Sequence, residues 1–241
     1  MEKVIHYVWV GRNPKPQKIL DCIKTWEKYM PDYKIIEWNE DNFDINQCKF
    51  AKQAYEAKKW AFVSDYMRFK ILFEHGGIYM DTDVELLKPI PQEILAKQAF
   101  TGFEYSKQIS PGLIYGCNKG DWVSKEMIKK YESIEFDPKN LITINLIITN
   151  ILANYGAKNN NEYQEINGLA IYPDEYFCGY NQDIKEVSTT DKTIAIHHYY
   201  GTWTKPTLKK KLQKIVKKIV GIENYKKILM LKRKIVNAKS K

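Results

Sequence analysis

The sequence predicts an α/β fold in which helices flank a mainly parallel β-sheet. Apolar runs of strand length alternate along the chain with segments whose apolar residues recur at helical spacing. Loops that contain Gly, Pro or Asn follow the strand-like runs. With 241 residues, of which 44% are hydrophobic, the chain is long enough to bury one substantial core.

The N-terminal part begins with a strand, a helix and a second strand. Val4–Val10 is rich in β-branched and aromatic residues and stops at a Gly/Pro loop, which is typical of a buried strand. Apolar residues then recur at helical spacing from Ile19 to Trp26, and Pro31 ends that helix. Tyr33–Trp38 is again apolar and aromatic, which predicts a second strand.

A long helical stretch comes next. It spans Phe50–His75, in one or two pieces, and Gly76-Gly77 ends it. Ile78–Met80 is a short apolar run that leads directly into Asp81. We expect a strand there, with the acidic residues at its exposed carboxyl end.

The remaining elements are less regular. We expect strands over Ala99–Phe103 and Thr193–His197, and helices near Trp122–Tyr131 and Leu141–Leu152. The sequence shows no internal repeat and no linker before about Thr204. It therefore predicts one catalytic domain over residues 1–206 and a tail over residues 207–241.

The charge of the chain is concentrated at its C-terminus. Lys205–Lys241 contains 14 basic residues and one acid, Glu223, whereas the other 204 residues carry 24 bases and 28 acids. A nucleic-acid-binding protein usually carries its basic surface on the folded domain itself. We therefore expect a mildly acidic body with a basic arm and no nucleic-acid partner.

The tail has the pattern of a basic amphipathic helix. Its apolar residues recur on one helical face, and lysines occupy most of the other positions; the apolar set is Leu208, Leu212, Ile215, Val216, Ile219 and Val220. Gly221 interrupts the pattern, and a second basic-apolar segment spans Tyr225–Val236. Such a helix is suited to an anionic membrane surface. The alternative is that its apolar face packs on the body of the protein.

Cysteine use and the N-terminus indicate a cytoplasmic protein. The four cysteines lie far apart and form no C-x-x-C pair, which argues against a zinc site and a small disulfide scaffold. Val4–Val10 is too short for a secretory signal, and no run reaches the ~18 apolar residues of a membrane span. With the basic tail, this predicts a peripheral protein on the inner face of the plasma membrane.

An acidic pair carries the clearest chemical signal. Asp81 and Asp83 follow Gly76-Gly77 and the apolar residues of a short strand. Two carboxylates at i and i+2 can both reach one Mn²⁺ or Mg²⁺ ion, which can also bind substrate phosphate oxygens. Such an ion neutralises the charge that develops on a diphosphate leaving group. The end of a parallel strand is also where α/β sheets place ligands.

Arg68 lies on the helix that leads into this acidic loop. The chain uses lysine 35 times and arginine three times, so arginine at this position suggests a specific requirement. Arginine pairs with carboxylates and phosphates in a bidentate manner that lysine cannot match. The alternative is a purely structural pair with Asp65 or a glutamate.

Together these motifs resemble the DXD-containing glycosyltransferases of family 32. The resemblance rests on the segment Ile5-His6-Tyr7-Val8-Trp9-Val10-Gly11, on Ser64-Asp65-x-x-Arg68 and on Gly76-Gly77-Ile78-Tyr79-x-Asp81-x-Asp83. It covers residues 3–90 well and residues 193–206 more loosely. It implies a GT-A fold, a UDP- or GDP-sugar donor, Mn²⁺ or Mg²⁺, and transfer of a hexose with retention of configuration. Galactose, glucose, their N-acetyl forms and mannose all remain candidates.

The resemblance also implies roles for individual residues. Trp9 would stack on the nucleobase, and Asp65 and Arg68 would hold the donor sugar. Asp81 would contact ribose and sugar hydroxyls or the metal, and Asp83 would bind the metal directly. The catalytic residues would be Asp65, Arg68 and Asp81. The donor site as a whole would comprise Val8, Trp9, Ser64, Asp65, Arg68, Gly77, Asp81, Thr82, Thr202, Trp203 and Lys205.

A second cluster lies near the end of the predicted domain. His198-Tyr199-Tyr200-Gly201 is similar to the His-Tyr-x-Gly of retaining galactosyltransferases, which implies that His198 completes the metal site with Asp81 and Asp83. Neighbouring residues of a strand point to opposite faces, so only one of His197 and His198 can do so.

The sequence offers no convincing nucleophile, and the resemblance implies front-side displacement. Asp174 and Glu175 lie in an expected acceptor-side loop, without an assigned role. The acceptor would be a glycan or a lipid-linked oligosaccharide in cell-surface polysaccharide synthesis.

Two other functions remain open. A haloacid-dehalogenase-type phosphatase also places D-x-D after a strand, although Gly and Thr usually follow where this chain has Val84 and Glu85. The other is a basic-tailed adaptor that is not an enzyme, against which the acidic body and the metal-type loop argue.

Overall fold

The computed structural model describes residues 1–182, 185–201 and 221 of the chain. Its contacts divide the chain into two units, one of residues 1–180 and 187–200, the other of residues 181–186 and 201–241. Most of the second unit lies outside the described residues, including the predicted tail, its helices and the predicted boundary at residue 206.

A seven-stranded mixed sheet forms the centre of this unit, with the strand order β2-β1-β3-β6-β5-β8-β7. The strands are β1 (Val4–Val8), β2 (Lys34–Trp38), β3 (Gly77–Tyr79), β5 (Ala99–Gly102), β6 (Tyr115–Cys117), β7 (Gln164–Ile166) and β8 (Leu169–Tyr172). The pairings of β6 and β7 are antiparallel, and the other five strands run in one direction. The predicted α/β fold with a mainly parallel sheet is therefore confirmed.

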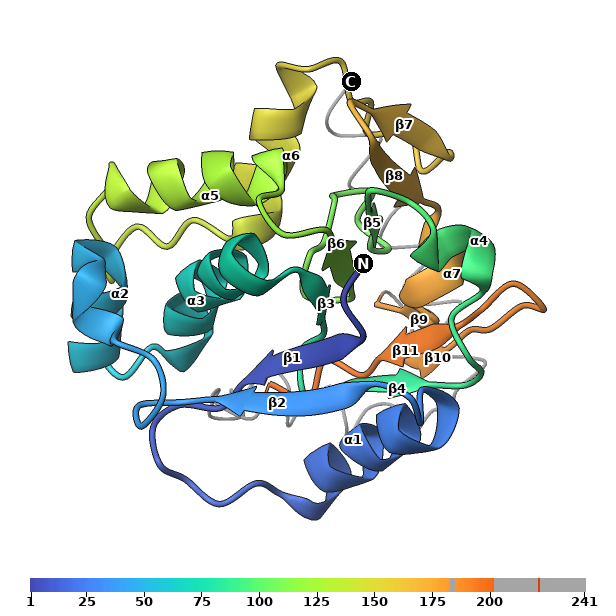
Figure 1. Ribbon diagram of the computed structural model, residues 1–241, viewed down its shortest axis with the longest axis horizontal. Coiled ribbons are helices and arrows are strands. Elements are labelled where there is room, and N and C mark those ends of the chain that lie inside the picture. Colours follow the sequence, from blue (N-terminus) through green and yellow to red (C-terminus); the bar gives the residue numbers. More distant parts are fainter. Residues whose placement is uncertain (183–184, 202–220, 222–241) are drawn as a thin grey trace. The chain divides into compact units, whose positions relative to one another are not determined.

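Helices lie on both faces of the sheet (Figure 1). They are α1 (Gln17–Tyr29), α2 (Lys49–Glu56), α3 (Trp60–His75), α4 (Gln92–Leu95), α5 (Trp122–Glu132), α6 (Ile144–Ala153) and α7 (Asp174–Phe177). A 3-10 turn, Ile45–Gln47, precedes α2. The expected helical stretch over residues 50–75 thus forms two helices, and Lys58 between them has a positive φ of 56°.

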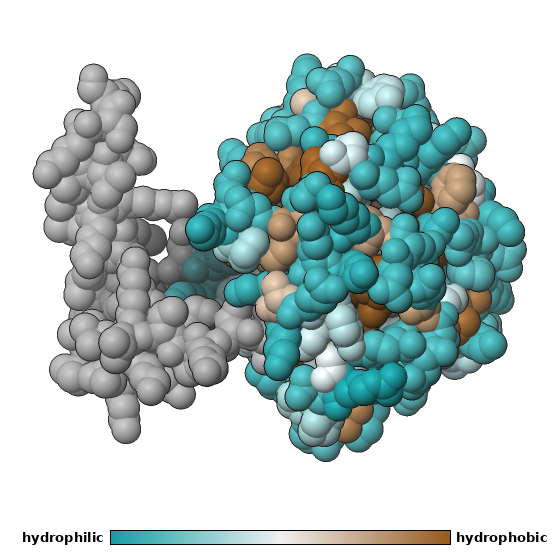
Figure 2. Space-filling model, turned by 90° about the vertical axis from the view of Figure 1, so that its left-hand side faces the viewer, coloured by the Kyte–Doolittle hydropathy of each residue, from teal (hydrophilic) through white to brown (hydrophobic). Residues whose placement is uncertain are grey.

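Two apolar clusters fill the layers between sheet and helices. One packs α2, α3, α5 and α6 against the sheet through residues such as Met67 and Ile148. The other packs α1, α4 and α7 through residues such as Trp26 and Phe177. Alternate residues of a strand enter opposite clusters, as Phe100 and Ala99 of β5 do. On the face seen in Figure 2, hydrophilic residues predominate and hydrophobic ones form separate patches.

Four further strands are very short. β4 (Val84–Leu86) pairs antiparallel with β11 (Ala195–His197), and β9 (Tyr180–Asn181) and β10 (Glu186–Val187) span two residues each. The sequence pattern did not reveal β4, β6, β8 or α7, because three- or four-residue elements show too little periodicity. The expected loop around Asp174 and Glu175 is instead the single turn of α7. Among the described residues, none of the helices combines the length and apolar composition that a membrane span requires.

Gly77 sits where α3 meets the sheet. It has a positive φ of 93°, and an added Cβ would lie 2.7 Å from the carbonyl oxygen of Val4. Glycine therefore lets β3 approach β1 closely. This packing role at the start of β3 accounts for a glycine here, and the role of Gly77 in substrate binding stays a prediction.

His6 is a buried histidine in β1, with 1% of its surface exposed. The Trp38 Nε1–H donates to His6 Nδ1 at 3.0 Å, so His6 Nε2 carries the proton and faces the Gly76 carbonyl oxygen at 3.0 Å. Burial lowers the pKa of His6 to about 4 despite the hydrogen bond to Gly76. The native state therefore holds His6 neutral.

We expect this histidine to make stability depend on pH. Below its ordinary pKa of 6.5 the unfolded chain takes up a proton that the native state refuses until about pH 4. The free energy of unfolding should therefore fall by up to about 3 kcal/mol as pH decreases through this window. Urea denaturation should show a shallower pH dependence for His6→Gln than for the wild type. Equal slopes for the two proteins would contradict the assignment.

Candidate active site

The chemical groups gather at the carboxyl ends of parallel strands. Trp9 follows β1, and Asp81 and Asp83 follow β3, which pairs with β1 in parallel. Glu104 follows β5, which runs in the same direction. This is the edge at which α/β sheets bind ligands.

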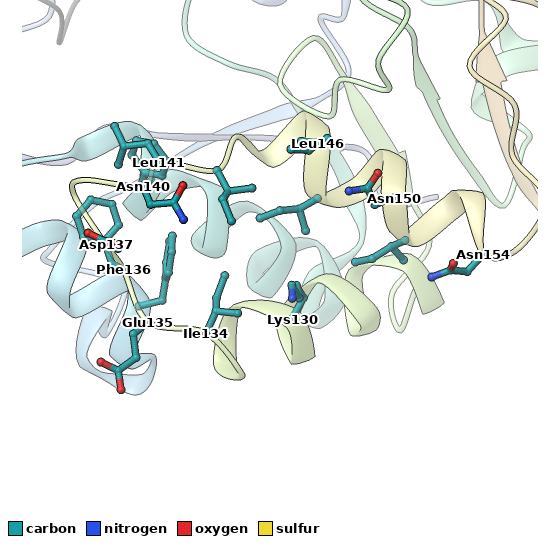
Figure 3. Close-up of a pocket in the computed structure, with 15 residues that line it drawn as sticks. Lys130, Ile134, Glu135, Phe136, Asp137, Asn140, Leu141, Leu146, Asn150 and Asn154 are labelled. Atoms are coloured by element: carbon teal, nitrogen blue, oxygen red, sulfur yellow. The ribbon is translucent and has the colours of Figure 1, made fainter.

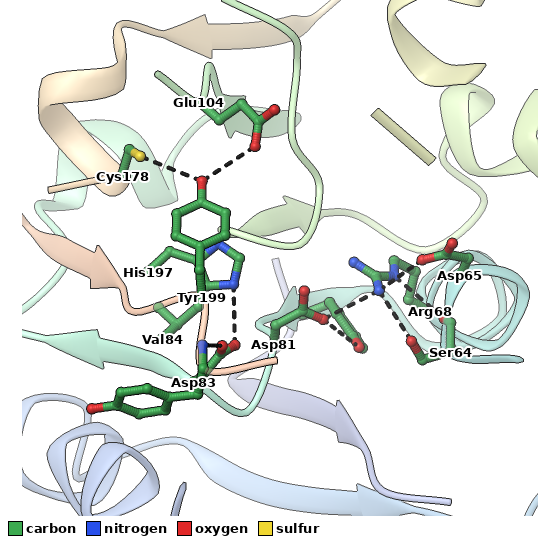
Figure 4. A network of polar contacts seen from close by, with 12 residues as sticks. Ser64, Asp65, Arg68, Asp81, Asp83, Val84, Glu104, Cys178, His197 and Tyr199 are labelled. Atoms are coloured by element: carbon green, nitrogen blue, oxygen red, sulfur yellow. Dashed lines mark hydrogen bonds and ion pairs between the residues drawn. The ribbon is translucent and has the colours of Figure 1, made fainter. Parts of the chain in front are cut away.

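Asp81, Asp83 and His197 form a candidate metal site. One ligand atom from each residue lies within 4.8 Å of the other two. His197 Nε2 is 3.1 Å from Asp83 Oδ1 (Figure 4). The antiparallel pairing of His197 with Val84 brings the imidazole to the acidic loop. Two carboxylates and an imidazole are a donor set that Mn²⁺ accepts, so these residues fit the ion that the sequence motif implies.

The structure brings His197, and not the predicted His198, into this cluster. His198 Nε2 lies 2.7 Å from Glu85 Oε2, and its ring stacks on Tyr200 at 4.8 Å. The two histidines have different partners because successive strand residues point to opposite faces. The sequence limited the choice to one of them, and the pairing of β11 with β4 selects His197.

Asp83 is buried, whereas the sequence analysis placed it at an exposed strand end. Only 4% of its surface is accessible, and its Oδ2 accepts a hydrogen bond from the Tyr200 amide at 2.8 Å. Burial disfavours its charge, but His197 and the Tyr200 amide outweigh this effect and keep the pKa of Asp83 below its usual value. Burial likewise opposes the charge on His197, yet Asp83 raises the pKa of His197 above its usual value. A bound cation would take the place of this imidazole proton.

Arg68 links Asp81 to α3. Its Nη2 lies 3.1 Å from Asp65 Oδ1 and 3.2 Å from Asp81 Oδ1, and it also donates to Ser64 Oγ at 3.2 Å (Figure 4). The side chain is 2% exposed. The structure therefore contains the Arg68–Asp65 ion pair that the sequence analysis gave as a purely structural alternative. Arg68 also pairs with Asp81, which joins this ion pair to the acidic loop.

Two features make this arginine more than a structural link. Its Nη1 is buried and has no hydrogen-bond partner among the described residues, which leaves its donor capacity unused. Burial raises the pKa of Asp65 to about 7, although Arg68 opposes this effect. Strongly shifted carboxylates of this kind concentrate at functional sites.

Two residues that the sequence analysis did not assign to the site shape the surroundings of Asp81. The Tyr79 hydroxyl donates to Asp81 Oδ1 at 3.1 Å, and the Gly112 carbonyl accepts from the Asp81 amide at 2.9 Å. A Cβ added to Gly112 would lie 2.3 Å from Asp81 Oδ2. No local signal marks Gly112, because it meets Asp81 only through the pairing of β3 with β6.

The other predicted donor-site residues differ in burial. Trp9 is half-buried, and its Nε1–H donates to the Asn13 carbonyl at 2.7 Å, which holds the ring at the edge of the sheet. Val8, which precedes Trp9, and Thr82, which follows Asp81, are both buried. Thr202, Trp203 and Lys205 lie outside the described residues.

Asp174 and Glu175 have structural partners of their own. Asp174 Oδ1 accepts from the Asn161 side chain at 2.8 Å, and Glu175 forms an ion pair with Lys192 at 2.8 Å. These contacts do not join either residue to the cluster of Asp81, Asp83 and His197.

A separate apolar hollow of about 620 Å³ lies between the helices. Its lining residues include Leu146 of α6 and, in the loop that follows α5, Ile134 and Phe136 (Figure 3). None of the residues that line it belongs to the acidic cluster. The hollow is therefore distinct from the candidate active site.

A known protein family matches the N-terminal part of the chain. Residues 16–101 match the family model described as "Glycosyltransferase sugar-binding region containing DXD motif". The match includes Ser64, Arg68 and both aspartates of the motif. It favours the transferase interpretation over the phosphatase and the adaptor.

Curated relatives match over part of the chain. "Subversion of eukaryotic traffic protein A" of Legionella pneumophila is 26% identical over 162 residues, which is 55% of this chain and 25% of that protein. "Initiation-specific alpha-1,6-mannosyltransferase" of Candida albicans is 30% identical over 134 residues, 50% of this chain and 34% of that protein. The matched part thus spans about a quarter to a third of these relatives.

Among solved structures, "PaToxG Glycosyltransferase" superimposes with a TM-score of 0.47 and 18% identity, covering 64% of this chain and 68% of that one. Residues 16–101, with their DXD motif at the carboxyl end of β3, are similar to the sugar-binding region of the DXD-containing glycosyltransferases.

Proposed function

We propose that this protein is a metal-dependent, retaining glycosyltransferase that moves a hexose from a nucleoside diphosphate sugar, with UDP as the favoured nucleotide. The observation that carries the proposal is the convergence of Asp81, Asp83, His197 and Arg68 at the end of β3. A glycan or lipid-linked oligosaccharide in cell-surface polysaccharide synthesis would be the acceptor.

The residues of the site divide the work by their contacts. Asp83, Asp81 and His197 would hold Mn²⁺ or Mg²⁺, which supplies positive charge to the diphosphate leaving group. Arg68 would direct its unpartnered Nη1–H groups to the donor, and Trp9 would contact the nucleobase. Asp65 would keep Arg68 oriented through the 3.1 Å ion pair.

These contacts favour front-side displacement. Asp65 and Asp81 both pair with Arg68, so we infer that neither attacks the donor sugar. In the proposed step, the bond between the anomeric carbon and the phosphate oxygen breaks while an acceptor hydroxyl bonds to that carbon on the same face. The departing phosphate oxygen takes the proton of the acceptor hydroxyl.

A donor panel tests the activity. UDP-galactose, UDP-glucose, their N-acetyl forms and GDP-mannose are incubated with the protein, with and without Mn²⁺, and released nucleoside diphosphate is measured. We expect release from one donor class in the presence of Mn²⁺. Folded protein that releases no diphosphate from any donor would contradict the transferase assignment, and equal release after chelation would contradict the metal requirement.

The Trp9→Ala variant tests the nucleobase contact in the same assay. Stacking of a base on an aromatic ring is worth about 1–3 kcal/mol, so the donor Kd should rise by about 5- to 150-fold. The melting temperature should change little because Trp9 is only half-buried. An unchanged Kd with a lowered melting temperature would assign Trp9 to the core instead.

We also propose that the basic tail holds the protein on the cytoplasmic face of an anionic membrane. Its support is the amphipathic pattern of residues 208–220 and the excess of lysine. A protein that ends at residue 206 should no longer sediment with phosphatidylserine-containing vesicles, whereas its hydrolysis of the donor should persist. Binding that survives truncation, or that ignores salt and lipid charge, would refute this role.

A further inference from the structure

Tyr199 adopts an uncommon backbone conformation beside the candidate metal site. Its φ is 51°, a region that non-glycine residues seldom occupy and that bulky residues enter at a cost. Its ring centroid lies 4.0 Å from that of His197, with 40° between the ring planes. The strained backbone thus coincides with a close contact to a candidate metal ligand.

The hydroxyl of Tyr199 ties the ring to the sheet. It donates to Glu104 Oε2 at 3.2 Å and lies 3.6 Å from Cys178 Sγ (Figure 4). Glu104 is 8% exposed, follows β5, and also accepts from Ser106 Oγ at 2.6 Å. The ring therefore spans from a carboxylate at the end of β5 to the imidazole of His197.

His197 lacks the support that usually orients a metal-binding histidine. Such a histidine normally donates its second ring N–H to a carboxylate, a carbonyl or water. In the described part of the chain, His197 Nδ1 is buried and has no hydrogen-bond partner. Its Nε2 faces Asp83, and the plane of the imidazole must be set by what packs against it.

We propose that Tyr199 and Glu104 are positioning residues that hold the imidazole of His197 in the orientation needed to bind a divalent cation with Asp81 and Asp83. This inference rests on the metal site of the proposed function. The aromatic ring supplies the orientation that a hydrogen bond at Nδ1 supplies elsewhere, and Glu104 holds the ring through its hydroxyl. The contact explains why a bulky residue occupies a left-handed conformation at this position.

Direct binding of Mn²⁺ to the full chain, without a donor, tests the proposal. Isothermal titration should show affinity weakened by about 10-fold or more in Tyr199→Leu, the range seen when orienting partners of metal ligands are lost. Tyr199→Phe, which keeps the ring and cuts the link to Glu104, should weaken binding less. Glu104→Gln should stay near the wild type because its amide oxygen can still accept the tyrosine hydroxyl.

Tyr176→Leu is the matched control. Tyr176 is also a partly buried tyrosine packed on the same apolar cluster, but its ring contacts are Tyr172 and Phe177. It should bind Mn²⁺ like the wild type, whatever its melting temperature. Equal losses of affinity in Tyr176→Leu and Tyr199→Leu would show a general packing effect and would overturn the proposal.

Asp83→Asn separates failure of this inference from failure of the proposed function. If the wild type binds Mn²⁺, Asp83→Asn does not, and Tyr199→Leu binds like the wild type, the metal site stands and the positioning role is wrong. If the wild type does not bind Mn²⁺, both fall. If Tyr199→Leu does not fold, Tyr199→Phe provides the test. A Mn²⁺ affinity of Tyr199→Phe equal to that of the wild type and of Glu104→Gln would overturn the role of the hydrogen bond to Glu104.

Discussion

Asp83→Asn is expected to lower sugar transfer by about 100-fold or more, the scale on which enzymes lose rate when a key electrostatic contact is removed. Asn is nearly isosteric and can still accept a hydrogen bond from the Tyr200 amide. It cannot supply the second negative charge for the cation. Transfer assays and Mn²⁺ titration on the same preparation would measure both effects.

Glu85→Gln provides the control for Asp83→Asn. Glu85 lies two residues further along the chain and also pairs with a histidine, His198, at 2.7 Å. It lies outside the cluster of Asp81, Asp83 and His197, so transfer and Mn²⁺ binding should persist in this variant. Full activity of Asp83→Asn in Mn²⁺ would refute the assignment of the metal site.

Arg68→Met should have the largest effect on stability. It leaves Asp65 and Asp81 without their shared cation, and Asp65 is almost entirely buried. Removing one partner from a buried ion pair typically costs about 3–5 kcal/mol. Donor turnover should be lost in the same variant because the guanidinium group is no longer available to the diphosphate.

The double variant Arg68→Met/Asp65→Asn separates the two roles of Arg68. It replaces the buried Asp65 carboxyl group, which has lost its ion-pair partner, with a neutral amide, so part of the stability should return while transfer stays absent. Lys70→Met is the control on the same helix, because Lys70 pairs with the partly exposed Glu74 and should contribute about 0.5 kcal/mol or less. Urea denaturation of the four proteins measures these differences, and wild-type stability of Arg68→Met would show that the ion pairs are not needed.

The sequence by itself determined the class of fold and the proximity of Arg68 to the acidic pair of the candidate site. Five elements have enough periodicity or apolar length to be recognised: β1, α1, β2, α3 and β3. Together they predict that a strand ends just before Asp81. The acidic pair and Arg68 lie within 16 residues of one another, so their association follows from local structure: a helix, a glycine turn and a short strand. Interactions that span few residues can be predicted from a sequence because few local conformations can satisfy them.

Only the tertiary structure could decide which histidine joins the acidic pair. His197 meets Asp83 across 114 residues because β11 pairs with β4 in a register that places His197 opposite Val84. A shift of one residue would bring His198 to the acidic loop instead, since side chains alternate between the faces of a strand. β4 and β11 have three residues each, too few for their pattern to define a register. The choice between two adjacent histidines therefore depends on long-range pairing and burial, which local sequence does not encode.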